Sequence, residues 1–388
     1  MDFMNNTMDG MDISNERPYK IEEYPTQRII IAILYGLLSL TGLLGNFLVI
    51  LAVILSKKLR TITNVFVVNL SIADCLTCLM LPFNIVGLLN LNGDQEMYLL
   101  SENICKGAAL ILFTCAGCSV YTLAAIGINR WYLITRPVRR YRTFFAKGRI
   151  TCMVFIVWCI PFLTAMLPPL LGLGELGYAT KYASCTHKTS HPLSDYYSML
   201  QSAIVYPIPL ITIVSTYVLI FVHIREHAKT ITEQPDISTT SYVSNAVSMD
   251  TNADLRKRLS RRQLEITRNL FYVVCAFFIC ITPYCIVLFI PPSDPLVPWT
   301  AAIFLVNSCV NPFIYATKHP HFKVIFKLIL SCKCSQIPEK SRIMRTIRSM
   351  RSIRSIKGRR KQRNVEKRNA KIKAQIAGLS SRDSFGTQ

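Results

Sequence analysis

The chain has 388 residues, of which 51% are hydrophobic and 17% charged, and its formal net charge at pH 7 is +22. With a mean hydropathy of +0.33, this composition excludes a set of two or three soluble domains and indicates one membrane domain with tails. The positive charge is concentrated in residues 318–388, which hold 20 lysine and arginine residues and three acidic ones. Such a tail would face the anionic lipids of an inner membrane leaflet, so we expect no nucleic-acid partner.

Residues 1–28 form an N-terminal tail that is polar and lacks the apolar segment of a signal peptide. We therefore expect the first membrane span to act as its own membrane signal. The tail contains Asn5-Asn6-Thr7, which offers a glycan acceptor at Asn5 if this end is extracellular. A chance match to this short motif is the alternative.

Seven apolar stretches, each of about 23 residues or more, contain no lysine or arginine, whereas a bilayer core needs roughly 20 helical residues. They are residues 29–55, 65–92, 107–129, 150–174, 196–224, 269–293 and 295–317. Because lipid offers no hydrogen-bond partners, only helices or closed barrels span it. We predict an all-α membrane protein, with a seven-transmembrane helix bundle over residues 29–317.

The distribution of basic residues orients this bundle. Seven spans place the two termini on opposite sides of the membrane. With the N-terminus outside, six of the 44 lysine and arginine residues lie in outer segments: Arg17, Lys20, Arg28, Lys106, Lys181 and Lys188. By the positive-inside rule, we expect a multi-pass plasma-membrane protein with an extracellular N-terminus and a cytoplasmic C-terminus.

Two of the 14 cysteines, Cys105 and Cys185, lie outside both the predicted spans and the cytoplasm. Cys105 stands at the outer mouth of the third span, and Cys185 lies in the loop between the fourth and fifth. Two lone cysteines on the oxidising side are expected to form one structural disulfide. Two unpaired thiols are the alternative.

Residues 318–334 follow the last span and predict an amphipathic helix on the inner leaflet, because apolar and lysine side chains recur at helical spacing. Cys332 and Cys334 at its end could take palmitate, or could remain free thiols. Residues 335–388 predict a basic, disordered cytoplasmic tail that binds anionic lipid. A solvated tail without lipid preference is the alternative.

Asp74 is the one acidic residue within the seven predicted spans, and an intramembrane carboxylate usually has a function. The polar residues that could surround it are Asn46, Ser119, Asn307, Ser308 and Asn311. A carboxylate among amide and hydroxyl oxygens suits a hydrated monovalent cation or a proton. A buried hydrogen-bond network that only specifies helix packing is the alternative.

Motifs in every span resemble those of the rhodopsin-like G-protein-coupled receptors, from residue 29 to about residue 332. The matching residues are Gly45-Asn46, Leu70 with Asp74, Cys105 and Arg130, Trp158, Pro209 with Tyr217, Pro283, and Asn311-Pro312-Phe313-Ile314-Tyr315. They occur in the family's order, and Cys185 is in the matching loop. Residues 56–61 and 69–74, with Asn129, resemble orphan invertebrate receptors and melatonin receptors more narrowly.

The resemblance implies a receptor, and not an enzyme, that converts binding of an extracellular ligand into guanine-nucleotide exchange on a heterotrimeric G protein, with arrestin as a further partner. It implies that Arg130 contacts the G protein, that Tyr217 and Tyr315 bridge to Arg130 through water, and that Pro283 and Pro312 supply kinks. It also implies an allosteric sodium ion in the Asp74 cluster, formed by Asp74, Ser119, Asn307, Ser308 and Asn311, and no other cofactor or metal.

Two departures from the family pattern concern activation. Asn129-Arg130-Trp131 replaces Asp/Glu-Arg-Tyr, so Arg130 lacks an adjacent acid and we expect activity without ligand. Gln263 stands where some members have a locking glutamate. In the sixth span, Cys280-Ile281-Thr282-Pro283 lacks the family's tryptophan above Phe277, so triggering must use other side chains or be weaker.

The resemblance also narrows the ligand. Leu112 stands where amine receptors have aspartate, and Leu305 stands where retinal proteins have lysine, so we expect neither an aminergic ligand nor retinal. The outer halves of the helices offer an apolar lining for a small molecule, a lipid or the apolar end of a peptide. The residues concerned, for which ordinary packing is the alternative, are Leu112, Phe113, Tyr284, Leu288 and Phe304.

Two other classes of function, a transporter and a membrane enzyme, are alternatives to a receptor. A transporter built around Asp74 predicts inverted repeats and further midplane charges, and the sequence shows neither. A membrane enzyme needs clustered nucleophiles or metal ligands. His223 and His227 are spaced four apart at the cytoplasmic end of the fifth span, without a third ligand, and are expected to be solvated.

Overall fold

The computed structural model describes residues 19–89, 102–188, 191–232, 271–290 and 294–338. The glycan acceptor Asn5, the position Gln263 and residues 339–388 of the basic tail lie outside the described residues. Predictions for these segments therefore stay predictions. All that follows concerns the described part of the chain.

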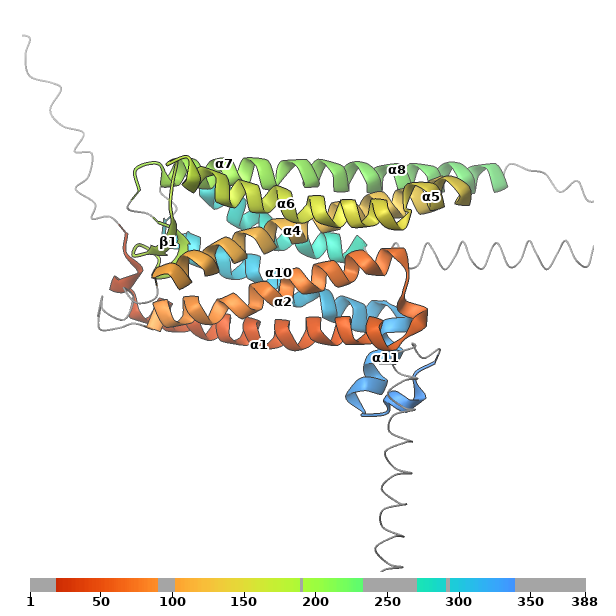
Figure 1. Ribbon diagram of the computed structural model, residues 1–388, viewed down its shortest axis with the longest axis horizontal. Coiled ribbons are helices and arrows are strands. Elements are labelled where there is room, and N and C mark those ends of the chain that lie inside the picture. Colours follow the sequence, from red (N-terminus) through yellow and green to blue (C-terminus); the bar gives the residue numbers. More distant parts are fainter. Residues whose placement is uncertain (1–18, 90–101, 189–190, 233–270, 291–293, 339–388) are drawn as a thin grey trace, which may run out of the picture.

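Seven membrane-length helices form the molecule and run side by side (Figure 1). They are α1 (Pro25–Leu55), α2 (Ile62–Leu89), α4 (Glu102–Thr135), α6 (Lys147–Leu170), α7 (Ser194–Val205) continued by α8 (Pro207–Thr232), the helix Phe271–Phe289, and α10 (Val297–Lys318). Each is long and apolar enough to cross a bilayer. The predicted all-α seven-helix bundle is confirmed, with α1 beginning at Pro25 instead of residue 29.

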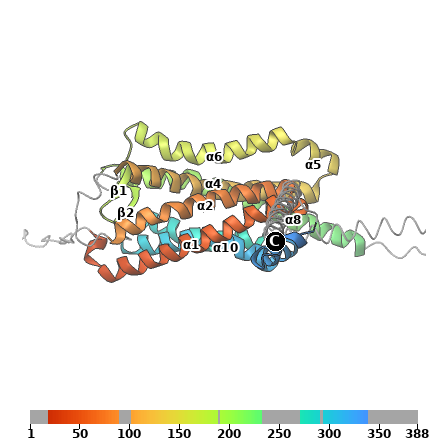
Figure 2. The same cartoon turned by 60° about the horizontal axis from the view of Figure 1, so that its bottom comes forward.

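The helix α4 lies in the middle of the bundle and α6 at its edge, as Figure 2 shows. The most apolar part of α4 is 61% buried, whereas the most apolar part of α6 is 17% buried. The helix α4 packs against α2, α6 and α8. It therefore contacts both the outer and the inner sites described below.

A short β-hairpin covers one end of the bundle. Its strands β1 (Leu176–Ala179) and β2 (Ser184–His187) pair antiparallel, with Tyr178 opposite Cys185. At the other end of the bundle lie α5 (Val138–Phe144) and α11 (Pro320–Leu330) (Figure 1). The hairpin and α11 thus mark the two membrane faces of the molecule.

The helix α11 falls within the predicted amphipathic segment. Phe322, Ile325 and Phe326 are buried against the bundle, whereas Val324 and Leu330 are exposed. An apolar side chain that is exposed at this position would lie in lipid if the helix rests on the membrane. The burial pattern accordingly supports the predicted orientation of α11.

Three segments are joined at the hairpin end of the bundle. The 3-10 helix Ile21–Glu23 buries Ile21 completely, and the Ile21 N–H donates to the Lys181 carbonyl at 3.0 Å. Lys181 pairs with Asp294 at 2.6 Å, and the Tyr182 hydroxyl donates to the same carboxylate at 3.0 Å. These contacts tie the N-terminal segment, the hairpin and the start of the last span together.

Candidate functional site

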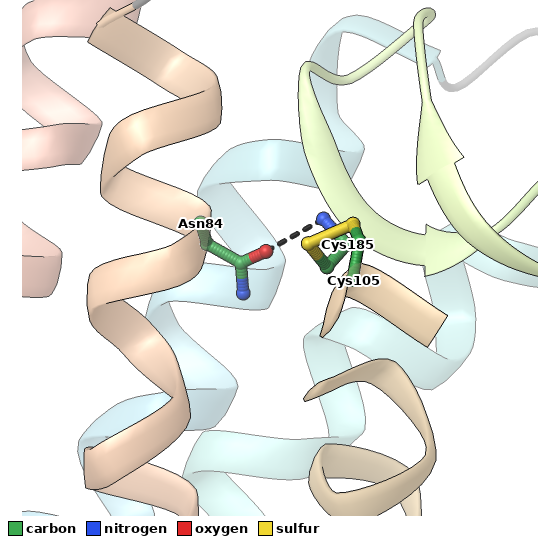
Figure 3. The surroundings of a disulfide bond; sticks show 3 residues. All are labelled: Asn84, Cys105 and Cys185. Carbon is green, nitrogen blue, oxygen red and sulfur yellow. Dashed lines mark hydrogen bonds between the residues drawn. A yellow bond between two sulfur atoms is a disulfide. The ribbon is translucent and has the colours of Figure 1, made fainter. Parts of the chain in front are cut away.

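The hairpin is fixed over the bundle by the disulfide Cys105–Cys185, which confirms the sequence prediction. The disulfide joins α4 to β2, with the two Cα atoms 5.1 Å apart. Asn84 of α2 adds a second attachment, because its Oδ1 accepts a hydrogen bond from the Cys185 N–H at 2.6 Å (Figure 3). Two helices, α4 and α2, therefore hold the hairpin in one position.

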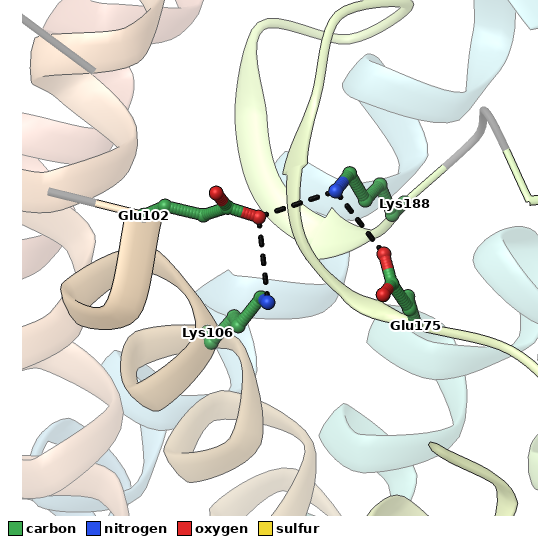
Figure 4. Close-up of polar contacts among 4 residues, drawn as sticks. All are labelled: Glu102, Lys106, Glu175 and Lys188. Atoms are coloured by element: carbon green, nitrogen blue, oxygen red, sulfur yellow. Dashed lines mark hydrogen bonds and ion pairs between the residues drawn. The ribbon is translucent and has the colours of Figure 1, made fainter. Parts of the chain in front are cut away.

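Ion pairs surround the same attachment (Figure 4). Lys188 Nζ lies 3.2 Å from Glu102 and 3.1 Å from Glu175, and Lys106 lies 3.4 Å from Glu102. Hydrogen bonds to Glu175 and Glu102 raise the pKa of the Lys188 ammonium. Because these side chains are partly exposed, solvent weakens each pair and the pairs contribute little to stability. The disulfide thus matters more for the position of the hairpin.

A cavity of about 60 Å³ lies beneath the hairpin and is lined by residues of α4, β2, α7, the helix Phe271–Phe289 and α10, and by Tyr206 between α7 and α8. Four of the five predicted ligand-pocket residues line it: Phe113, Tyr284, Leu288 and Phe304. Leu112 is not among its lining residues and packs against a neighbouring apolar cluster that contains Tyr35 and Leu305. The structure therefore brings four of the five residues to one cavity and places Leu112 in the cluster beside it.

Polar residues in this cavity were missed by the sequence analysis. His187 is buried between Ser198 and Gln201, with Nδ1 3.1 Å from Ser198 Oγ and Nε2 2.8 Å from Gln201 Oε1. Its ring stacks on Phe113 at a centroid distance of 4.3 Å. Burial lowers the pKa of His187 to about 4. His187 could have been identified from the sequence, because it follows the disulfide cysteine Cys185 by two residues. No feature of the sequence pointed to Gln201.

The predicted cation cluster is assembled at the middle of the bundle. Asp74 is fully buried and accepts hydrogen bonds from Ser119 Oγ at 3.1 Å and from Asn311 Nδ2 at 2.9 Å. Ser308 lies in the same layer, where its carbonyl accepts from Asn46 Nδ2 at 2.7 Å. The structure therefore brings residues of α1, α2, α4 and α10 together around one carboxylate.

The oxygens of this cluster fit a cation. Among the described residues, the buried Oδ1 atoms of Asn307 and Asn311 have no hydrogen-bond partner. Asn311 donates to Asp74, so its open oxygen lies beside the carboxylate. Carboxylate, amide and hydroxyl oxygens are the ligands that hard cations prefer. The donor set thus suits a sodium ion.

The end of α4 that lies away from the hairpin holds Asn129-Arg130-Trp131, one of the motifs that resemble the family. Asn129 is fully buried, accepts a hydrogen bond from Thr63 Oγ1 at 2.7 Å and donates from Nδ2 to the Tyr141 hydroxyl at 3.1 Å. Arg130 beside it is 4% exposed. Asn129 is therefore fixed by neutral partners on α2 and α5, which the sequence analysis did not foresee.

The residues predicted to take part in activation include Tyr217 and Tyr315. Their hydroxyls are buried and have no hydrogen-bond partner among the described residues, so they are open to water. Pro312 lies inside α10 and packs on Gly45 so closely that a Cβ at Gly45 would be 2.9 Å from the proline ring. Trp131 is half-buried and stacks edge-on against Tyr132.

The residues that replace the family's usual trigger connect the cavity to the core. Ile281 lines the cavity and is 5% exposed, and Phe277 is completely buried in the core cluster below. Thr282 Oγ1 lies 3.0 Å from the Tyr206 hydroxyl, which links the helix Phe271–Phe289 to the start of α8. A ligand in the cavity would thus contact Ile281 directly.

The structure is that of a seven-transmembrane receptor. It combines a seven-helix bundle, a disulfide-held hairpin over a cavity and a buried arginine at the opposite end. The sequence matches the family described as 7 transmembrane receptor (rhodopsin family) over residues 45–315. The chain therefore belongs to the rhodopsin family of seven-transmembrane receptors, which are signalling receptors and not enzymes.

Known proteins of several kinds resemble the chain. It is 27% identical to the human 5-hydroxytryptamine receptor 4 over 88% of this chain and 89% of that receptor. It is 30% identical to Danio rerio melanopsin-A, over 76% of this chain and 48% of melanopsin-A. The mouse melatonin receptor type 1A is 27% identical over 76% of this chain and 78% of that receptor. The crystal structure of squid rhodopsin shares the fold, with a TM-score of 0.63 and 21% identity over 79% of this chain and 87% of that one.

Proposed function

We propose that this receptor converts binding of an extracellular ligand beneath the hairpin into guanine-nucleotide exchange on a heterotrimeric G protein at the plasma membrane. The observation that carries the proposal is the continuous packing from the cavity to the inner face. Ile281 lines the cavity and, like Phe277 and Tyr315, is buried in one core cluster that reaches the inner ends of the helices. A displacement of Ile281 therefore has a packed route toward Arg130.

The topology proposed here has the N-terminus outside. It is supported by the basic residues, which gather at the end of the bundle that carries α5 and α11. The disulfide at the opposite end requires an oxidising compartment. Both features put the cavity outside the cell and Arg130 inside.

The proposed ligand is neither a protonated amine of the aminergic type nor retinal. Leu112 and Leu305, which stand where the family places an aspartate and a lysine for those ligands, belong to one apolar cluster. A cation there would be buried without a counter-ion, at a cost of several kcal/mol. The named relatives include a 5-hydroxytryptamine receptor and melanopsin-A, so this exclusion rests on the side chains of this chain alone.

Arg130 is the proposed contact for the G protein. Its guanidinium is buried in the described arrangement, so it must become accessible before a partner can reach it. Proline removes a backbone hydrogen bond, and Pro283 and Pro312 therefore mark points at which their helices can bend. Water between the open hydroxyls of Tyr217 and Tyr315 would then support the exposed arginine.

We also infer that the Asp74 cluster takes a sodium ion in the resting receptor. The ion would be held by Asp74, Ser119, Asn307, Ser308 and Asn311, and would supply the positive charge that a buried carboxylate lacks. The open oxygens of Asn307 and Asn311 support this assignment. Without a cation, Asp74 is stabilised by the hydrogen bonds from Ser119 and Asn311.

The cytoplasmic partners are proposed from α11 and its surroundings. Cys332 is exposed directly after α11, and Cys334 is half-buried, so both stand where a palmitoyl chain could enter the inner leaflet. Arrestin and anionic inner-leaflet lipids are further proposed partners. The lipid proposal is supported by the basic composition of the tail.

A cell-based assay tests the receptor proposal. Cells that express the chain with an energy-transfer reporter of G-protein dissociation are exposed to a small-molecule library, with Arg130→Ala as the matched control. We expect responses from the wild type that Arg130→Ala abolishes at equal surface expression. Responses that persist in Arg130→Ala would exclude the proposed transducer contact.

A further inference from the structure

The cavity beneath the hairpin is lined by polar residues from some elements and apolar residues from others. Ser198, Gln201 and Ser202 come from α7, and His187 comes from β2. Aromatic and aliphatic residues come from α4, the helix Phe271–Phe289 and α10. A ligand that fills the cavity would therefore meet hydrogen-bonding groups on one part of its surface and apolar contacts on the rest.

The described lining contains no formal charge. None of its fifteen residues has a carboxylate, an ammonium or a guanidinium group, and His187 is its one imidazole. Because burial lowers the pKa of His187 to about 4, this ring is neutral near pH 7. A charged ligand group would lose its hydration here without gaining a counter-charge, which is strongly unfavourable. The cavity thus favours an uncharged ligand.

His187 connects Ser198 and Gln201 in a hydrogen-bonded chain that has two neutral arrangements. If Nε2 carries the proton, it donates to Gln201 Oε1 at 2.8 Å, and the Ser198 hydroxyl donates to Nδ1 at 3.1 Å. If Nδ1 carries the proton, it donates to Ser198 and accepts at Nε2 from a turned Gln201 amide. Neither arrangement changes the charge of the cavity.

The two arrangements leave different ends of the Gln201 amide for a ligand. In the described part of the chain, the hydrogen bond to His187 is the one that Gln201 makes. The first arrangement therefore leaves an N–H donor in the cavity, and the second leaves a carbonyl acceptor. Gln201 can match either an acceptor or a donor on the ligand.

We propose that the cavity binds a small, uncharged amphiphile, with its apolar body against Phe113 and Phe304 and one amide, carbonyl or hydroxyl group hydrogen-bonded to Gln201. This inference rests on the proposed receptor function, since it names the ligand class of the same cavity. The volume of about 60 Å³ is small, so a larger ligand must displace lining side chains as it binds. The stacking of Phe113 on His187 places the apolar surface next to the polar chain.

Two matched series of probes test the ligand class. The indole series is N-acetyltryptamine (neutral), tryptamine (cationic) and indole-3-acetate (anionic), and the alkyl series is octanol, octylamine and octanoate. Thermal unfolding of the purified full-length receptor reports binding without any G protein, so failure of this inference is distinguishable from failure of coupling. We expect a neutral member to raise Tm, and the charged members of its series to raise it less.

Substitutions at two neighbouring positions of α7 make the test specific. Gln201→Leu removes the hydrogen-bonding amide and should weaken the neutral probe by about 10-fold, whereas Leu200→Ala, at an exposed neighbouring position, should not. Gln201→Glu keeps a partner for His187, should fold, and should gain tryptamine binding. The proposal is overturned if a charged probe stabilises the wild type more than its neutral partner, if no neutral probe stabilises it, or if Gln201→Leu and Gln201→Glu bind as the wild type does.

Discussion

Replacing Asn129 with aspartate should reduce ligand-independent signalling. In the structure, Thr63 donates to Asn129 Oδ1, and Asn129 Nδ2 donates to the Tyr141 hydroxyl. In Asn129→Asp the first bond is kept, and the tyrosine hydroxyl can turn to donate to the new oxygen. The substitution therefore leaves the hydrogen-bond partners in place and adds one negative charge beside Arg130.

The magnitude follows from that charge. Two unit charges about 4 Å apart attract by about 4 kcal/mol at an effective dielectric constant of about 20. Desolvation of the buried pair offsets part of this attraction, because Asn129 is fully buried and Arg130 is 4% exposed. A net gain of about 1–3 kcal/mol for the resting state would lower the active fraction by about 5- to 150-fold.

The assay is nucleotide exchange on a G protein in membranes, without ligand, normalised to receptor at the surface. Tyr141→Phe is the matched control, since it removes the hydroxyl that accepts from Asn129 and adds no charge. We expect measurable exchange by the wild type, a decrease in Asn129→Asp and no such decrease in Tyr141→Phe. A silent wild type, or an Asn129→Asp variant at least as active as the wild type, would refute the electrostatic reasoning.

Three further predictions use other sites. Cys105→Ala and Cys185→Ala should each cost about 2–4 kcal/mol and sharply lower surface expression, and unchanged folding in both would contradict the structural role of the disulfide. Asp74→Asn should remove the weakening of agonist affinity by sodium, and an unchanged sodium dependence in a binding assay excludes the site. The lowered pKa of His187 means that the unfolded chain protonates first, so stability should fall by about 1 kcal/mol per pH unit from about pH 6.5 toward pH 4. The stability of His187→Gln, measured by thermal unfolding, should depend less on pH over that range than the stability of the wild type. An equal pH dependence in the two proteins would contradict the lowered pKa of His187.

The bundle was predictable because lipid leaves few alternatives. A long stretch of apolar residues without lysine or arginine must form a helix there, and seven such stretches gave the seven helices with shifts of a few residues at their ends. The disulfide was predictable because Cys105 and Cys185 were the two cysteines left on the oxidising side. In both cases the chemistry of the compartment, and not the detail of packing, decides the structure.

The polar side of the ligand cavity was not predictable from spacing. His187 contacts Gln201 because the hairpin folds over α7, and the position of that hairpin cannot be predicted from the sequence. Leu112 and Phe113 are adjacent, so a helix sends their side chains about 100° apart. Phe113 consequently faces the cavity, whereas Leu112 packs toward Tyr35.

Asn129 shows the same limit at the inner face. Its sequence position indicated a missing charge, but its partners Thr63 and Tyr141 belong to α2 and α5 and are identified through the fold. These two hydrogen bonds hold Asn129 itself in place and add no charge beside Arg130.

Nucleotide exchange on purified G protein tests the central claim most directly. The wild type and Arg130→Ala, each purified and placed in lipid nanodiscs, are mixed with representatives of each G-protein class. The account predicts that the wild type accelerates exchange on at least one class, more so with a ligand that stabilises it, and that Arg130→Ala does not. Exchange at the spontaneous rate with the wild type under every condition, or equal acceleration by both proteins, would contradict it.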